Sequence, residues 1–364
     1  MTEKAYSAVL TAPRHLAILE YDLPEIADDD GLIKIEMAGI CHTDVERYNG
    51  AVVSAPYPLI LGHEIVGRVD RIGKMAARRW GVAEGDRVIV EPRVRCGFCS
   101  ACIMGNYKFC QNRIGYGTSM PADQLPHLWG SYGQYMYLAP GSILHRVSDA
   151  VSPRLATLIG VAISNGIQWA VVQGGVRLGD SVVVQGVGPI GLATVAVAKE
   201  AGAGPIIATG LTSDKAGFDL ALEFGADATV NVEEEDLVET VSRLTDGDLA
   251  DVVIDVTGSG SAVRTSIEIV KKGGTVVNAG ITGDTTLSPL LLDRVLYKEV
   301  RLQGVFTYDF RALRKSIKLV ERNHYSFEKI ITHEFPLIKA EEALQCAARE
   351  NPEMIPIKVA IVPN

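Results

Sequence analysis

Residues 181–202 read SVVVQGVGPIGLATVAVAKEAG, and this stretch decides the fold class of the second half of the chain. Its β-branched run predicts a strand over 181–185, and the following apolar sequence predicts a helix that continues to Ala203. The turn between them fits G-x-G-x-x-G, whose glycines let a pyrophosphate approach the start of the helix. The stretch therefore predicts dinucleotide binding, with a glycine-rich turn that only packs helix on strand as the alternative. The predicted cofactor residues are Gly186, Val187, Gly188, Pro189, Ile190 and Gly191.

The remainder of the second half repeats the alternation of strand and helix. Further strands are predicted over 205–209, 251–257 and 274–281, and helices over 215–224 and 260–272. Such alternation is typical of a doubly wound α/β fold, in which helices connect the strands of a parallel sheet.

The first 150 residues have a different pattern. Short apolar runs over 32–40, 64–73 and 86–92 are separated by glycine, proline and aspartate, which predicts antiparallel strands in a barrel-like, β-rich domain. A helix over 312–322 and a strand over 355–363 end the chain. We therefore expect a β-rich domain made of 1–160 and 305–364, and a doubly wound domain made of 161–304.

Composition excludes several classes of protein. The chain has 364 residues, 47% of them hydrophobic and 22% charged, which is typical of a globular enzyme. A net charge of −9 would repel phosphates, so no nucleic-acid partner is expected. The N-terminus lacks the pattern of a signal peptide, and glycines and a proline interrupt the longest apolar stretch, over 181–198. We expect a cytoplasmic protein without a membrane span.

Four of the six cysteines form a C-x2-C-x2-C-x7-C cluster within fifteen residues. Four converging thiolates suit a tetrahedral zinc ion or an iron–sulfur centre, and they leave no open position for a substrate. Two local disulfides are the alternative, but disulfides belong mainly to oxidising compartments. The cluster therefore predicts a structural metal, held by Cys96, Cys99, Cys102 and Cys110.

The second strand of a dinucleotide fold commonly ends in an acid that binds the adenosine ribose of NAD. Here that strand ends in Thr209-Gly210, and the nearest acid is Asp214. Without an acid at Gly210, Thr212, Ser213 and Lys215 could receive the 2′-phosphate of NADP, although no arginine is present there. Alternatively, Asp214 reaches the ribose. The choice between NAD(H) and NADP(H) stays open.

Two further motifs carry metal ligands. Cys41 lies in Gly-Ile-Cys-His-Thr-Asp, and His63 and Glu64 lie in Gly-His-Glu-Ile-Val-Gly. Together with the cysteine cluster and the glycine motif, they make the chain resemble the medium-chain zinc-dependent alcohol and polyol dehydrogenases over essentially its whole length. The resemblance implies a GroES-like catalytic domain, a Rossmann domain and an active site between them. It also implies two zinc ions per chain, one catalytic and one structural, in a homodimer or homotetramer.

The resemblance assigns roles to individual residues. Cys41 and His63 match ligands of the catalytic zinc, Thr43 matches the hydroxyl residue that binds the substrate alcohol, and Asp44 matches a carboxylate that orients the histidine. The position of a third ligand, a cysteine in many relatives, is Val161 here. Glu64 is therefore predicted as the third ligand, or alternatively as a carboxylate behind the ligands. The resemblance further places these residues near the cofactor: His42, Asn165, Thr257, Asn278–Ile281 and Lys358.

The implied reaction is hydride transfer between an alcohol and NAD(P), with zinc as a Lewis acid and Thr43 passing on the proton. Glu46 stands where many relatives have the histidine that ends the proton relay. A mixed, moderately apolar pocket is expected, which suits a secondary or cyclic alcohol or ketone. Its lining is expected from residues near Tyr48, Val52–Tyr57, Trp129–Tyr132 and Phe306–Phe310, and Val161 and Ile163 are expected to add apolar surface next to the metal.

Three other functions remain open at this point. The chain could be a polyol dehydrogenase of the sorbitol or threonine type. It could resemble the quinone reductase-like members, which lack catalytic zinc. It could also be a non-enzymatic protein that senses redox state or dinucleotides.

Overall fold

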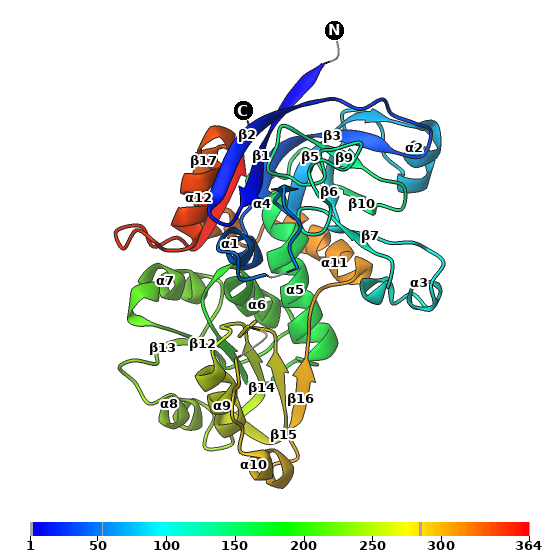
Figure 1. Cartoon of the computed structure of the whole chain (residues 1–364). Coiled ribbons are helices and arrows are strands. Elements are labelled where there is room, and N and C mark those ends of the chain that lie inside the picture. The colour runs from blue at the N-terminus through cyan, green and yellow to red at the C-terminus, as the bar shows by residue number, and fades with distance from the viewer. Residues whose placement is uncertain (1–2, 53, 284–285, 364) are drawn as a thin grey trace. The chain divides into compact units, whose positions relative to one another are not determined.

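The computed structural model describes residues 3–52, 54–283 and 286–363 (Figure 1). These residues form two compact units, one up to Gly160 and again from Ile331 onward, the other Val161–Ile330. The first boundary lies where the sequence predicts it, at residue 160. Residues 305–330, predicted in the first unit, pack in the second.

The contacts of this segment explain the difference. Ser316 Oγ lies 3.0 Å from Ser164 Oγ, Tyr325 donates a hydrogen bond to Glu200, and Lys329 pairs with Glu223, all inside the second unit. Sequence periodicity identifies the helix here but does not reveal which unit it covers.

The second unit contains a six-stranded parallel sheet with strand order β13-β12-β11-β14-β15-β16. This is the predicted doubly wound order, in which the first and fourth strands lie side by side. Interior residues such as Val183, Ile207 and Val253 are fully buried, as expected for strands covered on both faces. The strands are β11 (Val182–Gln185), β12 (Ile206–Gly210), β13 (Ala228–Asn231), β14 (Ala250–Asp255), β15 (Val270–Asn278) and β16 (Arg301–Gly304). The helices are α5 (Ser164–Gly166), α6 (Pro189–Glu200), α7 (Lys215–Glu223), α8 (Leu237–Leu244), α9 (Gly260–Ile269), α10 (Leu292–Tyr297) and α11 (Phe310–Glu321), with 3-10 turns η4 (Thr212–Asp214) and η5 (Phe327–Ile330).

The first unit is β-rich, with one sheet of order β2-β1-β4 and a larger one of order β10-β6-β5-β3-β18-β17, where β9 also pairs with β3. Figure 1 shows the C-terminal β17 and α12, in red and orange, beside the blue N-terminal strands. The strands are β1 (Lys4–Ala12), β2 (His15–Asp22), β3 (Gly31–Gly39), β4 (Leu59–Ile60), β5 (Glu64–Ile72), β6 (Arg87–Val90), β7 (Arg93–Val94), β8 (Ile114–Gly115), β9 (Tyr135–Leu138), β10 (Leu144–Arg146), β17 (Ile331–Pro336) and β18 (Lys358–Val362). The helices are α1 (His42–Tyr48), α2 (Lys74–Trp80), α3 (Ser100–Ile103), α4 (Pro153–Leu158) and α12 (Ala340–Ala347), with 3-10 turns η1 (Tyr107–Phe109) and η6 (Leu337–Lys339).

Strand register in the larger sheet brings the predicted ligands together. β3 and β5 are antiparallel with Gly39 opposite Glu64, so Cys41, just after β3, comes close to His63, just before β5. β18 pairs antiparallel with β3, Ala360 opposite Gly39, and so carries Lys358 to the same place. Three segments far apart in the sequence thus meet at one end of the sheet.

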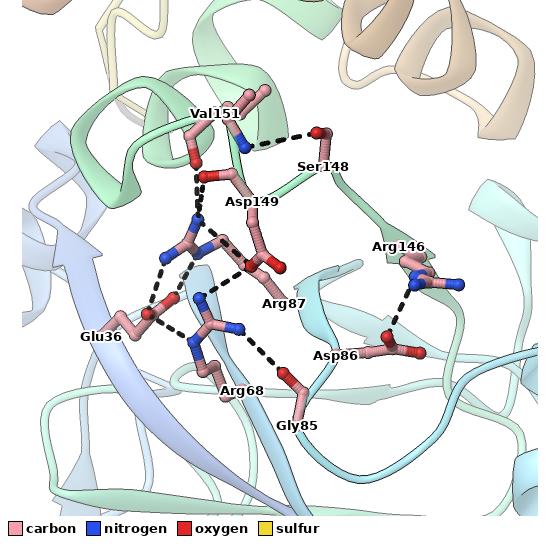
Figure 2. Close-up of polar contacts among 10 residues, drawn as sticks. Glu36, Arg68, Gly85, Asp86, Arg87, Arg146, Ser148, Asp149 and Val151 are labelled. Carbon is pink, nitrogen blue, oxygen red and sulfur yellow. Dashed lines mark hydrogen bonds and ion pairs between the residues drawn. The ribbon is translucent and has the colours of Figure 1, made fainter.

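A network of ion pairs ties β3, β5 and β6 to the loop that follows β10 (Figure 2). Arg87 forms two hydrogen bonds with Glu36, at 2.6 and 2.9 Å, and also donates to the Val151 carbonyl at 2.7 Å. Arg68 joins Glu36 at 3.1 Å and Asp149 at 2.8 Å. Because the Arg87 side chain is only 8% exposed, water stabilises its positive charge little, and these partners compensate for the lost hydration.

One continuous helical stretch, Pro153–Gln173, is long and apolar enough to cross a membrane by length and composition alone. It is 78% buried inside the molecule, and core helices commonly meet the same criterion. Two π-helical stretches, η2 (Ile159–Ile163) and η3 (Ile167–Gln173), interrupt it. Val161, at the position of the absent third cysteine, lies in the first of them.

Candidate active site and metal sites

Helix α1 starts at the predicted ligand Cys41 and is fixed there by Asp44. The Asp44 carboxylate accepts a hydrogen bond from the Cys41 backbone N–H at 2.9 Å, which satisfies a donor that a helix start leaves unpaired. Asp44 is fully buried, so it needs partners for its remaining lone pairs.

His63 is one of those partners. Its Nδ1 lies 3.0 Å from Asp44 Oδ1, and Tyr132 donates a hydrogen bond to Asp44 Oδ2 at 3.1 Å. With Nδ1 bonded to the carboxylate, Nε2 lies 3.5 Å from Thr43 Oγ1, and the imidazole also hydrogen-bonds the Cys41 thiol. This carboxylate–histidine pair is the arrangement that orients a metal-binding imidazole.

The electrostatics of the pair fit a cation between Cys41 and His63. Burial disfavours a charged imidazole, but the Asp44 carboxylate and the Cys41 thiol outweigh it and raise the pKa of His63 to about 10. Burial likewise disfavours a Cys41 thiolate, yet the hydrogen bond and charge of His63 lower the pKa of Cys41. An imidazole nitrogen and a cysteine sulfur, the groups that His63 and Cys41 supply, are typical zinc ligands.

Glu64 does not join this pair. Its Oε1 lies 2.6 Å from Lys358 Nζ, which also donates to the Ile40 carbonyl at 2.9 Å. A Cβ atom on Gly39 would lie 2.0 Å from the other carboxylate oxygen, so glycine is required for this close approach. Here the Glu64 carboxylate pairs with Lys358; the roles of Glu64 as third ligand or as a carboxylate behind the ligands, and of Lys358 beside the pyrophosphate, stay predictions.

The four-cysteine cluster does converge. Within residues 3–52, 54–283 and 286–363, it is the one group of three or more metal-ligating side chains whose ligand atoms all lie within 4.8 Å of one another. The sulfurs of Cys96 and Cys102 are 4.0 Å apart, and those of Cys99 and Cys110 are 3.9 Å apart. Four sulfurs at the usual zinc–sulfur distance stand roughly 3.8 Å apart. All four cysteines are free thiols, which removes the disulfide alternative.

Two tyrosines at the predicted pocket lining are buried. Tyr48 is 1% exposed and donates its hydroxyl hydrogen to Glu341, so it belongs to the core. Tyr132 is also buried, and its hydroxyl donates a hydrogen bond to Asp44. Residue 53 of the predicted lining lies outside the described residues.

His42, predicted near the cofactor, is exposed, whereas Glu46, at the predicted end of the proton relay, is half-buried.

The glycine motif of the second unit has the shape that a pyrophosphate needs. Gly186 has φ +104° at the end of β11, and a Cβ on Gly191 would lie 1.8 Å from the Gly186 carbonyl oxygen. Pro189 begins α6, whose first N–H groups therefore face the turn. Gly188 has open space around its missing Cβ, which leaves room beside the backbone.

Buried polar atoms without a hydrogen-bond partner among the described residues lie on the elements around this turn. They are Asn165 Oδ1, Asp255 Oδ2 and Asn278 Oδ1. Asp255 and Asn278 end β14 and β15, at the edge where such sheets bind nucleotides. The Thr257 hydroxyl, in contrast, is bonded to Asp255 at 2.6 Å. The three unpaired oxygens are hydrogen-bond acceptors, which suit the hydroxyl and amide donors of a dinucleotide; the roles of Asn165 and Thr257 stay predictions.

Sequence comparison agrees with the two units. Residues 27–149 match the family model described as alcohol dehydrogenase GroES-like domain, and 189–322 match the one described as zinc-binding dehydrogenase. A probable alcohol dehydrogenase of Mycobacterium tuberculosis is 39% identical over 98% of this chain and 97% of its own length. A sorbitol dehydrogenase of Bombyx mori is 34% identical over 95% of this chain and 96% of its own length.

The structure has the same fold as solved members. An alcohol dehydrogenase from Thermotoga maritima superposes with a TM-score of 0.90 at 27% identity, covering all of both chains. The fold, the motifs and these matches agree along the whole length. The chain therefore belongs to the medium-chain zinc-dependent alcohol and polyol dehydrogenases.

Proposed function

We propose that the chain interconverts a secondary or cyclic alcohol and its ketone with NAD(H) or NADP(H), at a zinc held by Cys41 and His63. The observation that carries this proposal is the Asp44–His63 pair, whose imidazole also hydrogen-bonds the Cys41 thiol. A bound zinc would supply Lewis acidity that lowers the pKa of the substrate alcohol.

The side chains around the pair position His63 and transfer the substrate proton. Asp44 holds the His63 ring in position, and Tyr132 and the Cys41 backbone in turn hold Asp44. Thr43, whose Oγ1 lies 3.5 Å from His63 Nε2, would accept the proton of the substrate hydroxyl and pass it on. Glu64 and Lys358 act behind the ligands as a neutral pair.

We assign a second zinc, structural in role, to the four cysteines. The lobe that carries them exposes Phe98, Ile103 and Phe109 and so has little apolar core of its own. A metal that links Cys96, Cys99, Cys102 and Cys110 would stabilise the folded lobe in place of an apolar core. We further propose a cytoplasmic homodimer or homotetramer.

A polyol is the second candidate substrate, because a sorbitol dehydrogenase is among the relatives at 34% identity. A panel of secondary alcohols, cyclic alcohols, sorbitol, xylitol and threonine, followed by NAD(P)H absorbance, separates the candidates. A higher kcat/KM for an apolar alcohol than for any polyol supports the proposal. Faster oxidation of sorbitol or threonine would favour the second candidate. Metal analysis that finds only one zinc per chain would contradict a zinc mechanism.

A further inference from the structure

The strand that should carry the ribose-binding acid ends in a residue without a side chain. β12 ends at Gly210, and its parallel neighbour β13 places Asn231 beside it. The chain then continues from Asn231 into Glu233, so the neighbouring strand brings a carboxylate to the turn that follows Gly210.

Two hydrogen bonds fix this carboxylate and its strand on Thr212. Glu233 Oε2 accepts from the Thr212 backbone N–H at 2.8 Å, and Asn231 Nδ2 donates to Thr212 Oγ1 at 2.9 Å. The Val232 N–H also donates to the Gly210 carbonyl at 3.1 Å. The bonds from Thr212 lower the pKa of Glu233, which is therefore charged at neutral pH.

This arrangement occupies one of the groups that a 2′-phosphate would use, the backbone N–H of Thr212. Thr212 and Lys215 are the polar and cationic candidates on the turn, and the Thr212 amide already binds an anion. Asp214 turns its carboxylate back to the Leu211 N–H at 3.1 Å, so it adds negative charge rather than a donor. A phosphate monoester carries about two negative charges and would be repelled there.

We infer that Glu233 is a cofactor-selecting residue, which makes the chain prefer NAD(H) over NADP(H) by taking the place of the acid that Gly210 lacks. The inference rests on the proposed dinucleotide site. It differs from the usual arrangement because the carboxylate comes from the turn after β13 rather than from the end of β12. Since Glu233 is exposed, solvent screens its charge, and the effect should weaken with added salt.

Dissociation constants of NADH and NADPH, from the quenching of protein fluorescence, test the inference on the full-length protein. The wild type should bind NADH more tightly, and Glu233→Gln should shift the NADPH/NADH affinity ratio toward NADPH by about tenfold. Glutamine can still accept from the Thr212 amide, so this variant changes charge and little else. Glu233→Asp keeps the charge and should retain the preference for NADH.

Glu234→Gln is the matched control, because it removes an equal charge from the same exposed turn while Glu233 keeps its bond to Thr212. Its affinity ratio should move much less than that of Glu233→Gln. A wild type that prefers NADPH, or equal shifts in the two variants, would overturn the inference but leave the dinucleotide site intact. If neither nucleotide binds the wild type, the proposed function itself fails, and the inference fails with it.

Discussion

Lys358 Nζ lies 2.6 Å from Glu64 Oε1, and both side chains are almost completely removed from solvent, at 6% and 3% exposure. Two opposite charges in such a place are stable only together, because either alone would be buried without compensation. The pair therefore joins β18 to the start of β5, beside Cys41 and His63.

Lys358→Met should lower the free energy of unfolding by about 3 kcal/mol, since it leaves the Glu64 carboxylate buried and unpaired. The double variant Glu64→Gln, Lys358→Met should recover much of that loss in urea unfolding. Lys4→Met breaks an exposed ion pair with Glu20 and serves as the control, with a much smaller loss than Lys358→Met. Equal losses in the single and double variants would show that the charges do not compensate each other.

Asp44→Asn should weaken zinc binding at the proposed catalytic site by about 10- to 100-fold, because the imidazole loses its orienting charge. Titration with a competing chelator measures this affinity. Tyr132→Phe removes only one neutral donor to Asp44 and should have a smaller effect. A catalytic zinc that binds Asp44→Asn as tightly as the wild type would contradict the assigned role.

Cys41→Ala should reduce kcat by at least about 10³-fold, since loss of a ligand removes the Lewis acid. NADH affinity should remain within about twofold of the wild type, because the dinucleotide residues lie on other elements. Stopped-flow turnover and NADH titration measure the two effects separately. Full turnover in this variant would rule out the zinc mechanism.

Removal of the structural metal should loosen one lobe rather than the whole molecule. After treatment with a strong chelator, backbone amides of 96–110 should exchange at least about tenfold faster, since exposed Phe98 and Phe109 provide little packing. Amides in β3 should keep their protection. The same treatment of Cys102→Ser should add no further change, and a response spread over all strands would contradict a local role.

Glu36→Gln should destabilise the first unit by roughly 2 kcal/mol at neutral pH. Burial raises the pKa of Glu36, but Arg87 and Arg68 outweigh it and hold the pKa below its usual value. A lowered folded-state pKa contributes stability that is present above the unfolded-state value and is lost as pH falls. The difference in unfolding free energy between wild type and variant should therefore shrink below about pH 4. A constant difference from pH 7 to pH 3 would contradict this account.

Local sequence patterns predicted the fold well because strands and helices follow from periodicity. The strands predicted over 181–185 and 64–73 correspond to β11 and β5, and the predicted and observed bounds differ by one residue at one end of each strand. Strand pairing between distant segments was harder to predict. Nothing near residue 358 indicates that β18 lies against β3, and this pairing gives Lys358 its partner.

Because pairing between distant strands is hard to predict, the contacts that depend on it were not predicted either. Tyr132 bonds Asp44 across 88 positions of sequence, and Glu233 reaches Thr212 only because β12 and β13 are neighbours. Short motifs identified Cys41, Asp44 and His63, since their spacing is local. Residues that support a motif from another strand leave no local signal.

The pairing of β18 with β3 also constrains the order in which the two units can form during synthesis. Residues 161–330 are contiguous, so the parallel sheet can assemble as soon as they have been translated. The first unit is interrupted, and the Ala38–Gly39 end of β3 has no β18 partner until the segment from residue 331 onward has been translated. Glu64 lacks this counter-charge until Lys358 has been translated, so the end of the sheet that carries Cys41 and His63 cannot take its final form before then.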